Sequence, residues 1–149
     1  MRGTVLCDVT DSLAGRSAAE FAGALGARLG LRLVLVHVVT GVPRAALESV
    51  TGRQLRSGAE RTVAAIAHEL GHDAETRVAV GDHAEALARV AAEEGADLVV
   101  VGARQAGLGG RNLRWTLARE LEAATPVPVL VAPPSTRKRS DRRLSASAR

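Results

Sequence analysis

Short apolar runs alternate along this chain with segments whose apolar residues recur at helical spacing. The runs are almost continuous stretches of Val and Leu, which is typical of strands buried on both faces of a sheet. Strands that alternate with helices imply a parallel sheet with helices on both faces, because right-handed crossovers place the helices there. The sequence therefore predicts an α/β domain. The predicted strands cover residues 4–9, 31–39, 76–80, 98–101 and 127–132.

The segments between these strands predict four helices. Asp11 and Ser12 offer N-cap oxygens to the first helix, which we expect to end at Gly30. In such a fold, ligands bind beyond the carboxyl ends of the strands, which points to the loops over residues 9–12 and 102–112. The apolar stripes of the other three helices are Leu55, Ala59, Val63, Ile66 and Leu70, ending at Gly71; Ala84, Leu87, Ala88 and Ala91, ending near Gly95; and Leu113, Leu117 and Leu121.

The length of 149 residues suits one domain with one core. A hydrophobic fraction of 46% with a net charge of +4 is unlike the composition of a disordered chain. No apolar run approaches the roughly 20 residues of a membrane span, and the first residues lead directly into a strand. We therefore expect no signal peptide and no membrane anchor. The single Cys7 cannot form an internal disulfide, which fits a cytoplasmic location.

The charge is unevenly distributed along the chain. Residues 134–149 carry six basic side chains and one acid, Asp141, so this segment is +5 while residues 1–133 sum to −1. We expect a folded domain over residues 1–133 followed by a disordered basic tail. The tail is interpreted either as an arm for an anionic partner or as a solvated segment without a partner. Ser145 follows Arg142-Arg143-Leu144, a pattern that resembles a basophilic kinase site.

The segment His68-Glu69-Leu70-Gly71-His72 spells H-E-x-x-H, the signature of zinc peptidases. Two His one helical turn apart can share a metal while the Glu activates its water. However, the helical period places His68 on the outward face, and Gly71 is typical of a helix end, which leaves His72 outside the helix. We interpret the motif as a chance match and keep a zinc metallopeptidase as a remote alternative.

Other reactive side chains have simpler interpretations. Cys7 lies inside the first predicted strand and is expected to be an inert buried thiol. His37 ends the second strand near the predicted ligand site, where a hydrogen-bonded structural histidine is favoured over a catalytic base. His83 opens the third helix, and we expect it to help cap that helix. Ser12 lies in no G-x-S-x-G elbow, so serine hydrolysis is not indicated.

Four segments together resemble the universal stress protein family, over residues 4–134. The resemblance implies a sheet order of 3-2-1-4-5 and a homodimer formed through the last strand, from Val127 to Ala132. It also implies a nucleotide cleft between the first and fourth strands, which binds ATP in one branch of the family and not in another. The four segments are Gly30-Leu31-Arg32-Leu33-Val34-Leu35-Val36-His37-Val38, Gly81-Asp82-His83-Ala84-Glu85-Ala86-Leu87, Gly95-Ala96-Asp97-Leu98-Val99-Val100-Val101-Gly102 and Thr125-Pro126-Val127-Pro128-Val129-Leu130-Val131.

The resemblance also assigns cleft residues, several of which are substituted. The ATP-binding branch carries an Asp before a Gly-Ser or Asp-Ser pair; here Thr10 precedes Asp11-Ser12, and Asp8 lies two residues earlier. Its phosphate element is G-x2-G-x9-G-S/T after the fourth strand. In this chain the four positions of the element are Gly102, Gln105, Trp115 and Thr116. A further cleft position, on the second strand, is Val38.

Trp115 is the substitution with the largest expected effect, because an indole stands where a phosphate needs bare backbone. We therefore predict a binding or regulatory role in stress response without catalysis, and no ATP binding in the family's usual manner. The alternative is an ATP-binding protein with a rearranged phosphate loop. That loop would be an anion-binding nest built from Arg104, Gly107, Gly109, Gly110 and Arg111.

Overall fold

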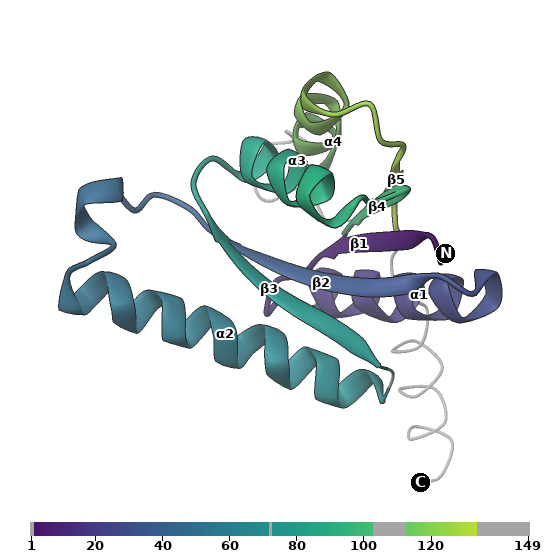
Figure 1. Ribbon diagram of the computed structural model, residues 1–149, viewed down its shortest axis with the longest axis horizontal. Coiled ribbons are helices and arrows are strands. Elements are labelled where there is room, and N and C mark those ends of the chain that lie inside the picture. The colour runs from purple at the N-terminus through teal and green to yellow at the C-terminus, as the bar shows by residue number, and fades with distance from the viewer. Residues whose placement is uncertain (1, 72, 103–112, 134–149) are drawn as a thin grey trace, which may run out of the picture.

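The computed structural model describes residues 2–71, 73–102 and 113–133, with the side chains of residues 113–116 left aside. Strands and helices alternate from the N-terminus to residue 133 (Figure 1). They are β1 (Thr4–Asp8), α1 (Leu13–Leu29), β2 (Arg32–Val39), the short 3₁₀ helix η1 (Arg44–Ala46), α2 (Val50–Leu70), β3 (Ala74–Val80), α3 (His83–Glu94), β4 (Leu98–Val101), α4 (Leu113–Ala124) and β5 (Val129–Val131).

The strands form one five-stranded sheet in the order β3-β2-β1-β4-β5. Every neighbouring pair is parallel, with β1 in the middle. The chain thus first builds the sheet outward from β1 to β3 and then crosses back to add β4 and β5. The predicted α/β class and the strand order implied by the resemblance are confirmed.

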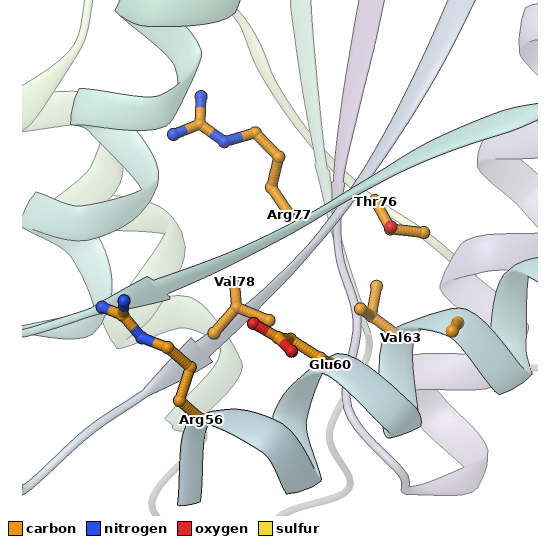
Figure 2. A pocket seen from close by; sticks show the side chains of 7 residues that line it. Arg56, Glu60, Val63, Thr76, Arg77 and Val78 are labelled. Atoms are coloured by element: carbon orange, nitrogen blue, oxygen red, sulfur yellow. The ribbon is translucent and has the colours of Figure 1, made fainter. Parts of the chain in front are cut away.

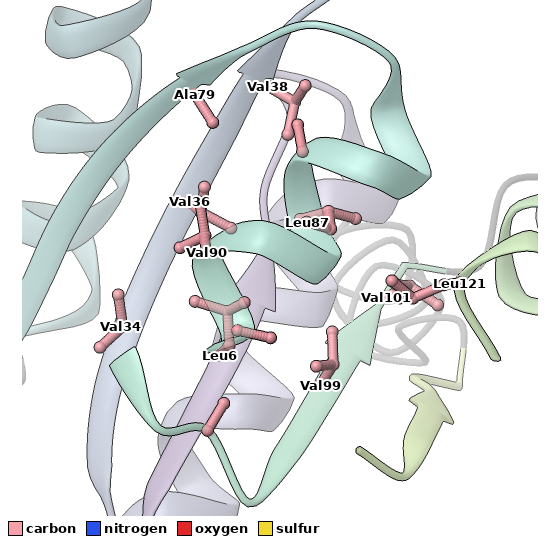
Figure 3. Packing of buried hydrophobic residues seen from close by; sticks show 13 residues of the cluster. Leu6, Val34, Val36, Val38, Ala79, Leu87, Val90, Val99, Val101 and Leu121 are labelled. Carbon is pink, nitrogen blue, oxygen red and sulfur yellow. The ribbon is translucent and has the colours of Figure 1, made fainter. Parts of the chain in front are cut away.

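Helices cover both faces of the sheet, and two buried clusters fill the space between the layers. The strands contribute alternate residues to the two clusters, because successive side chains point to opposite faces. On the α3 and α4 face the larger members are Leu6, Val34, Val36, Leu87, Val90, Val99, Val101 and Leu121 (Figure 3). On the α1 and α2 face they are Val5, Cys7, Val9, Leu33, Leu35, Val63, Ile66 and Val100, packed against the alanines of α1.

Local chemistry defines where three of the helices begin and end. The side chains of Ser12, Ser49 and Asp82 each accept a hydrogen bond from a backbone N–H in the first turn, of α1, α2 and α3 respectively. Each of these helices then ends in a glycine with left-handed backbone, at Gly30, Gly71 and Gly95. The predicted ends are therefore confirmed.

Several boundaries differ from prediction: β1 ends at Asp8 and β2 begins at Arg32, each one residue inside its predicted range. α2 begins at Val50, not near Leu55, because the Ser49 cap starts the helix before its apolar stripe begins. β3 begins at Ala74, two residues before the predicted Thr76, and β5 covers only Val129–Val131. Among the described residues, no helix has the length and apolar character needed to cross a membrane.

Candidate functional site

Asp8 is a buried carboxylate at the carboxyl end of the central strand. Its side chain is 6% exposed, and its Oδ2 lies 3.0 Å from Nε2 of His83, the first residue of α3. Its Oδ1 is buried and has no hydrogen-bond partner among the described residues. Because burying a carboxylate is costly without a partner, the His83 contact stabilises the junction between β1 and α3.

This contact corrects the role predicted for His83. Asp82 caps α3, since its Oδ1 accepts from the backbone N–H of Glu85 at 3.2 Å. His83 instead directs its ring to Asp8. The hydrogen bond predicted for His37 is present: its Nδ1 lies 2.8 Å from the Val9 carbonyl oxygen, so the imidazole is held by the backbone.

Thr10 belongs to the turn that caps α1. Its Oγ1 lies 2.6 Å from Ser12 Oγ, and Ser12 Oγ in turn accepts from Gly15 N–H at 3.1 Å. The turn is pressed against the helix, because a Cβ added to Gly15 would lie 2.5 Å from the Thr10 nitrogen. Asp11 points outward and pairs with Arg16 at 3.0 Å. The loop after β1 is thus fixed by its own hydrogen bonds.

The remaining cleft residues are only partly described. Val38 is buried in the cluster on the α3 face. Gly102 follows β4, and a Cβ there would lie 3.0 Å from the Ala14 carbonyl oxygen, so this end of β4 abuts the first turn of α1. Both lie at the carboxyl ends of the sheet's strands, as do Thr10 and Asp11. The other predicted cleft residues lie outside the described part of the chain. They are Gln105, Gly107 and the side chains of Trp115 and Thr116, together with the residues of the alternative loop, Arg104, Gly109, Gly110 and Arg111.

The zinc-peptidase motif lacks the environment of a catalytic centre in the part of it that is described. His68 and Glu69 are exposed on α2, as the helical period predicts. The Glu69 carboxylate, which would have to activate a water in a zinc peptidase, forms an ion pair with the Arg16 guanidinium. His72 lies outside the described residues. In the ranges that are described, no three His, Cys, Asp or Glu side chains gather as a metal site would require.

Cys7 is fully buried in the α1 and α2 face of the core. Burial, and secondarily the charge of Asp8, raise the pKa of its thiol well above the ordinary value. Because the thiolate is the reactive species, the predicted inert thiol agrees with this environment.

The comparison with family models settles the relationship that the fold suggests. The model of the universal stress protein family matches residues 1–133. The chain belongs to the universal stress protein family. No curated protein matches this chain.

Solved structures of the same family share the fold of this universal stress protein domain. A family member from Burkholderia pseudomallei is 25% identical with a TM-score of 0.65, covering 89% of this chain and 96% of its own. One from Archaeoglobus fulgidus, in complex with dAMP, is 17% identical with a TM-score of 0.59, covering 88% and 98%. One from Arabidopsis thaliana, with AMP bound, is 18% identical with a TM-score of 0.63, covering 91% and 94%.

Proposed function

We propose that this universal stress protein domain has a binding or regulatory role in stress response, without catalysis, and that it does not bind ATP in the manner the resemblance implies. One observation carries the proposal. At the end of β1, where the resemblance assigns a carboxylate, Thr10 presents a hydroxyl that is engaged by Ser12. A neutral hydroxyl that is hydrogen-bonded to the N-cap Ser12 cannot supply the charged acceptor that a nucleotide's amine or hydroxyl groups would meet.

The nearby carboxylate does not replace the missing one. Asp8 is buried, with its side chain 6% exposed, and its Oδ2 contacts His83. Asp11 is exposed but pairs with Arg16. Together with Trp115 in place of a glycine, these residues favour a cleft that has lost the ATP site.

Isothermal titration of the full chain with ATP and with AMP tests the proposal. We expect no saturable binding in the micromolar range. A triple variant, Thr10→Asp with Gln105→Gly and Trp115→Gly, should acquire ATP binding, because it restores the carboxylate and the bare backbone together. The matched control carries Thr10→Asn in the same background, which keeps the shape and removes the charge. Saturable binding of ATP by the unaltered chain with micromolar affinity would contradict the proposal.

Nucleotide binding through a rearranged loop is the second candidate. It is supported by the two structural neighbours described with dAMP and AMP. On this candidate the unaltered chain binds AMP, and the affinity falls when Arg104 and Arg111 are replaced by Ala. The same titrations therefore separate the two functions.

We also propose a cytoplasmic homodimer that forms through the strand from Val127 to Ala132. In its support, β5 is the outermost strand on its side of the sheet, and Leu130 is 36% exposed there. The single thiol of Cys7 is consistent with a reducing compartment.

A further inference from the structure

The opposite edge of the sheet is formed by β3, the longest strand after β2. Gly81 N–H donates to the Val39 carbonyl, so in the parallel ladder the backbone groups of residues 75, 77 and 79 also face β2. The N–H and C=O groups of Ala74, Thr76 and Val78 therefore point outward, away from the sheet. No described strand pairs with them. Such a row of outward groups is a template for another strand.

The neighbouring helix leaves room beside this edge. α2 packs on both β2 and β3, so it covers the face of the sheet. Between α2 and β3 lies an open groove of about 480 Å³, with Val63, Ala64 and Val78 as its apolar lining and Arg56 and Glu60 along the helix (Figure 2). Figure 2 shows Val78 directed toward α2 and Arg77 directed to the other side of the strand. A strand added to β3 would place alternate side chains over this groove.

The charge pattern of β3 identifies the strand that fits. Glu75 and Arg77 flank the exposed Thr76. In an antiparallel pair of two copies of β3 centred on Thr76, each Glu75 lies opposite the Arg77 of the second copy, and the two Thr76 residues face each other. Opposite charges and Thr–Thr pairs in these positions stabilise antiparallel strands.

The two neighbouring registers, centred one residue to either side of Thr76, are less favourable. A shift of the centre to Arg77 places two arginines opposite each other, and a shift to Glu75 places two glutamates opposite each other. Like charges directly opposite are destabilising. Within each copy Glu75 is already paired with Arg32, and Arg77 with Glu93 and Glu94 on α3, so the pairs between copies would extend an existing network of charges on this face of the sheet.

We propose that the outer edge of β3 is a self-association surface, on which a second copy of this chain adds its own β3 antiparallel about a two-fold axis at Thr76. The contact is independent of the proposed β5 contact, because the two strands form opposite edges of the sheet. Where both contacts form, the sheet continues through successive copies and the assembly is larger than a dimer.

The test is the mass of the full chain in solution over a wide range of concentration, by analytical ultracentrifugation. Thr76→Lys places two ammonium groups opposite each other and should weaken the β3 association about tenfold. Thr76→Val keeps a β-branched residue in the strand and removes only the Thr–Thr hydrogen bond, so it should weaken the association much less than Thr76→Lys does. Thr51→Lys, an equal change of charge at an exposed position of α2, should also leave it unchanged.

Hydrogen exchange on the unaltered chain gives a second, independent measurement. Protection of the Thr76 and Val78 amides should rise with concentration, because their N–H groups become bonded only in the assembly. Leu130→Lys, at the β5 edge, should leave this rise intact. The proposal is wrong if the unaltered chain stays monomeric throughout. It is equally wrong if Thr76→Lys gives the mass distribution of Thr76→Val, or if only Leu130→Lys dissociates the assembly.

Discussion

Gly52 lies in the first turn of α2, pressed against the segment that precedes the helix. A Cβ added there would lie 2.7 Å from the Leu47 Cα and closer still to the Ala46 carbonyl oxygen. Both are backbone atoms that cannot move aside without shifting η1. We expect Gly52→Ala to lower the free energy of unfolding by about 1–3 kcal/mol, measured by urea denaturation.

Gly58 on the same helix is the matched control. A Cβ there would have no neighbour within 4 Å. Gly58→Ala should therefore raise the free energy of unfolding by about 0.5–1 kcal/mol, through the better helix propensity of alanine. An increase of the free energy of unfolding in both variants would show that propensity alone governs these sites, contrary to the close approach described.

Single residues differ in how far the sequence predicts them. The glycine stops at Gly30, Gly71 and Gly95 were predictable, because a left-handed C-cap is a local requirement. The contact between Asp8 and His83 was not, since it depends on where the start of α3 lies relative to β1. A carboxylate ending an apolar run, and a His just after the Asp82 cap, were the only signals in the sequence.

At the scale of elements, the end of α3 is tied to two strands through Glu94. Its carboxylate accepts from Arg77 of β3 at 3.0 Å and from Arg32 of β2 at 2.8 Å. Hydrogen bonding by Arg77, and then by Arg32, lowers the pKa of Glu94 below its ordinary value. Because its pKa is lower in the folded state, the ionised Glu94 stabilises the fold at pH values above its unfolded-state pKa, which is near 4.3. This stabilisation is lost as the pH falls through the folded-state pKa.

We therefore expect Glu94→Gln to be less stable than the unaltered protein at neutral pH, with the difference shrinking as the pH falls below about 4. Urea denaturation followed across this range measures it. Glu122→Gln is the control, because Glu122 is exposed on α4 and forms no ion pair with any described residue. A Glu94→Gln deficit that stays constant down to acidic pH would mean that packing, and not the carboxylate charge, is responsible.

The elements themselves were largely predictable, for identifiable reasons. The central strands are buried on both faces and leave runs of Val and Leu, and the shorter apolar runs at residues 76–80 and 127–132 marked the two edge strands, so all five strands were recognised from the apolar runs along the sequence. The start of α2 was missed because its first turns, from Val50 to Gln54, carry no apolar stripe and are held by the Ser49 cap. Of the cleft residues, four lie at the carboxyl ends of the strands, as the topology requires: Thr10, Asp11, Val38 and Gly102. The role of each depends on contacts within the loops, which the periodicity of the sequence does not encode.

For the whole molecule, the central sheet belongs to both halves of the core. Along β1, for example, Leu6 packs on the α3 side while Val5 and Cys7 pack on the α1 side. A change on either side therefore acts on strands that the other side needs. We expect the described domain to unfold as one cooperative unit.

Leu87→Ala tests this expectation from one face. Leu87 is fully buried between α3 and the sheet, so its truncation should lower the free energy of unfolding by about 2–5 kcal/mol. Leu35→Ala, fully buried on the other face, provides the matched change. In both variants, far-UV circular dichroism and amide exchange on α1 and α3 should report one shared midpoint. If α1 and α2 keep their protection after α3 loses it in Leu87→Ala, the two faces unfold separately, and the alternation of strand residues does not couple them.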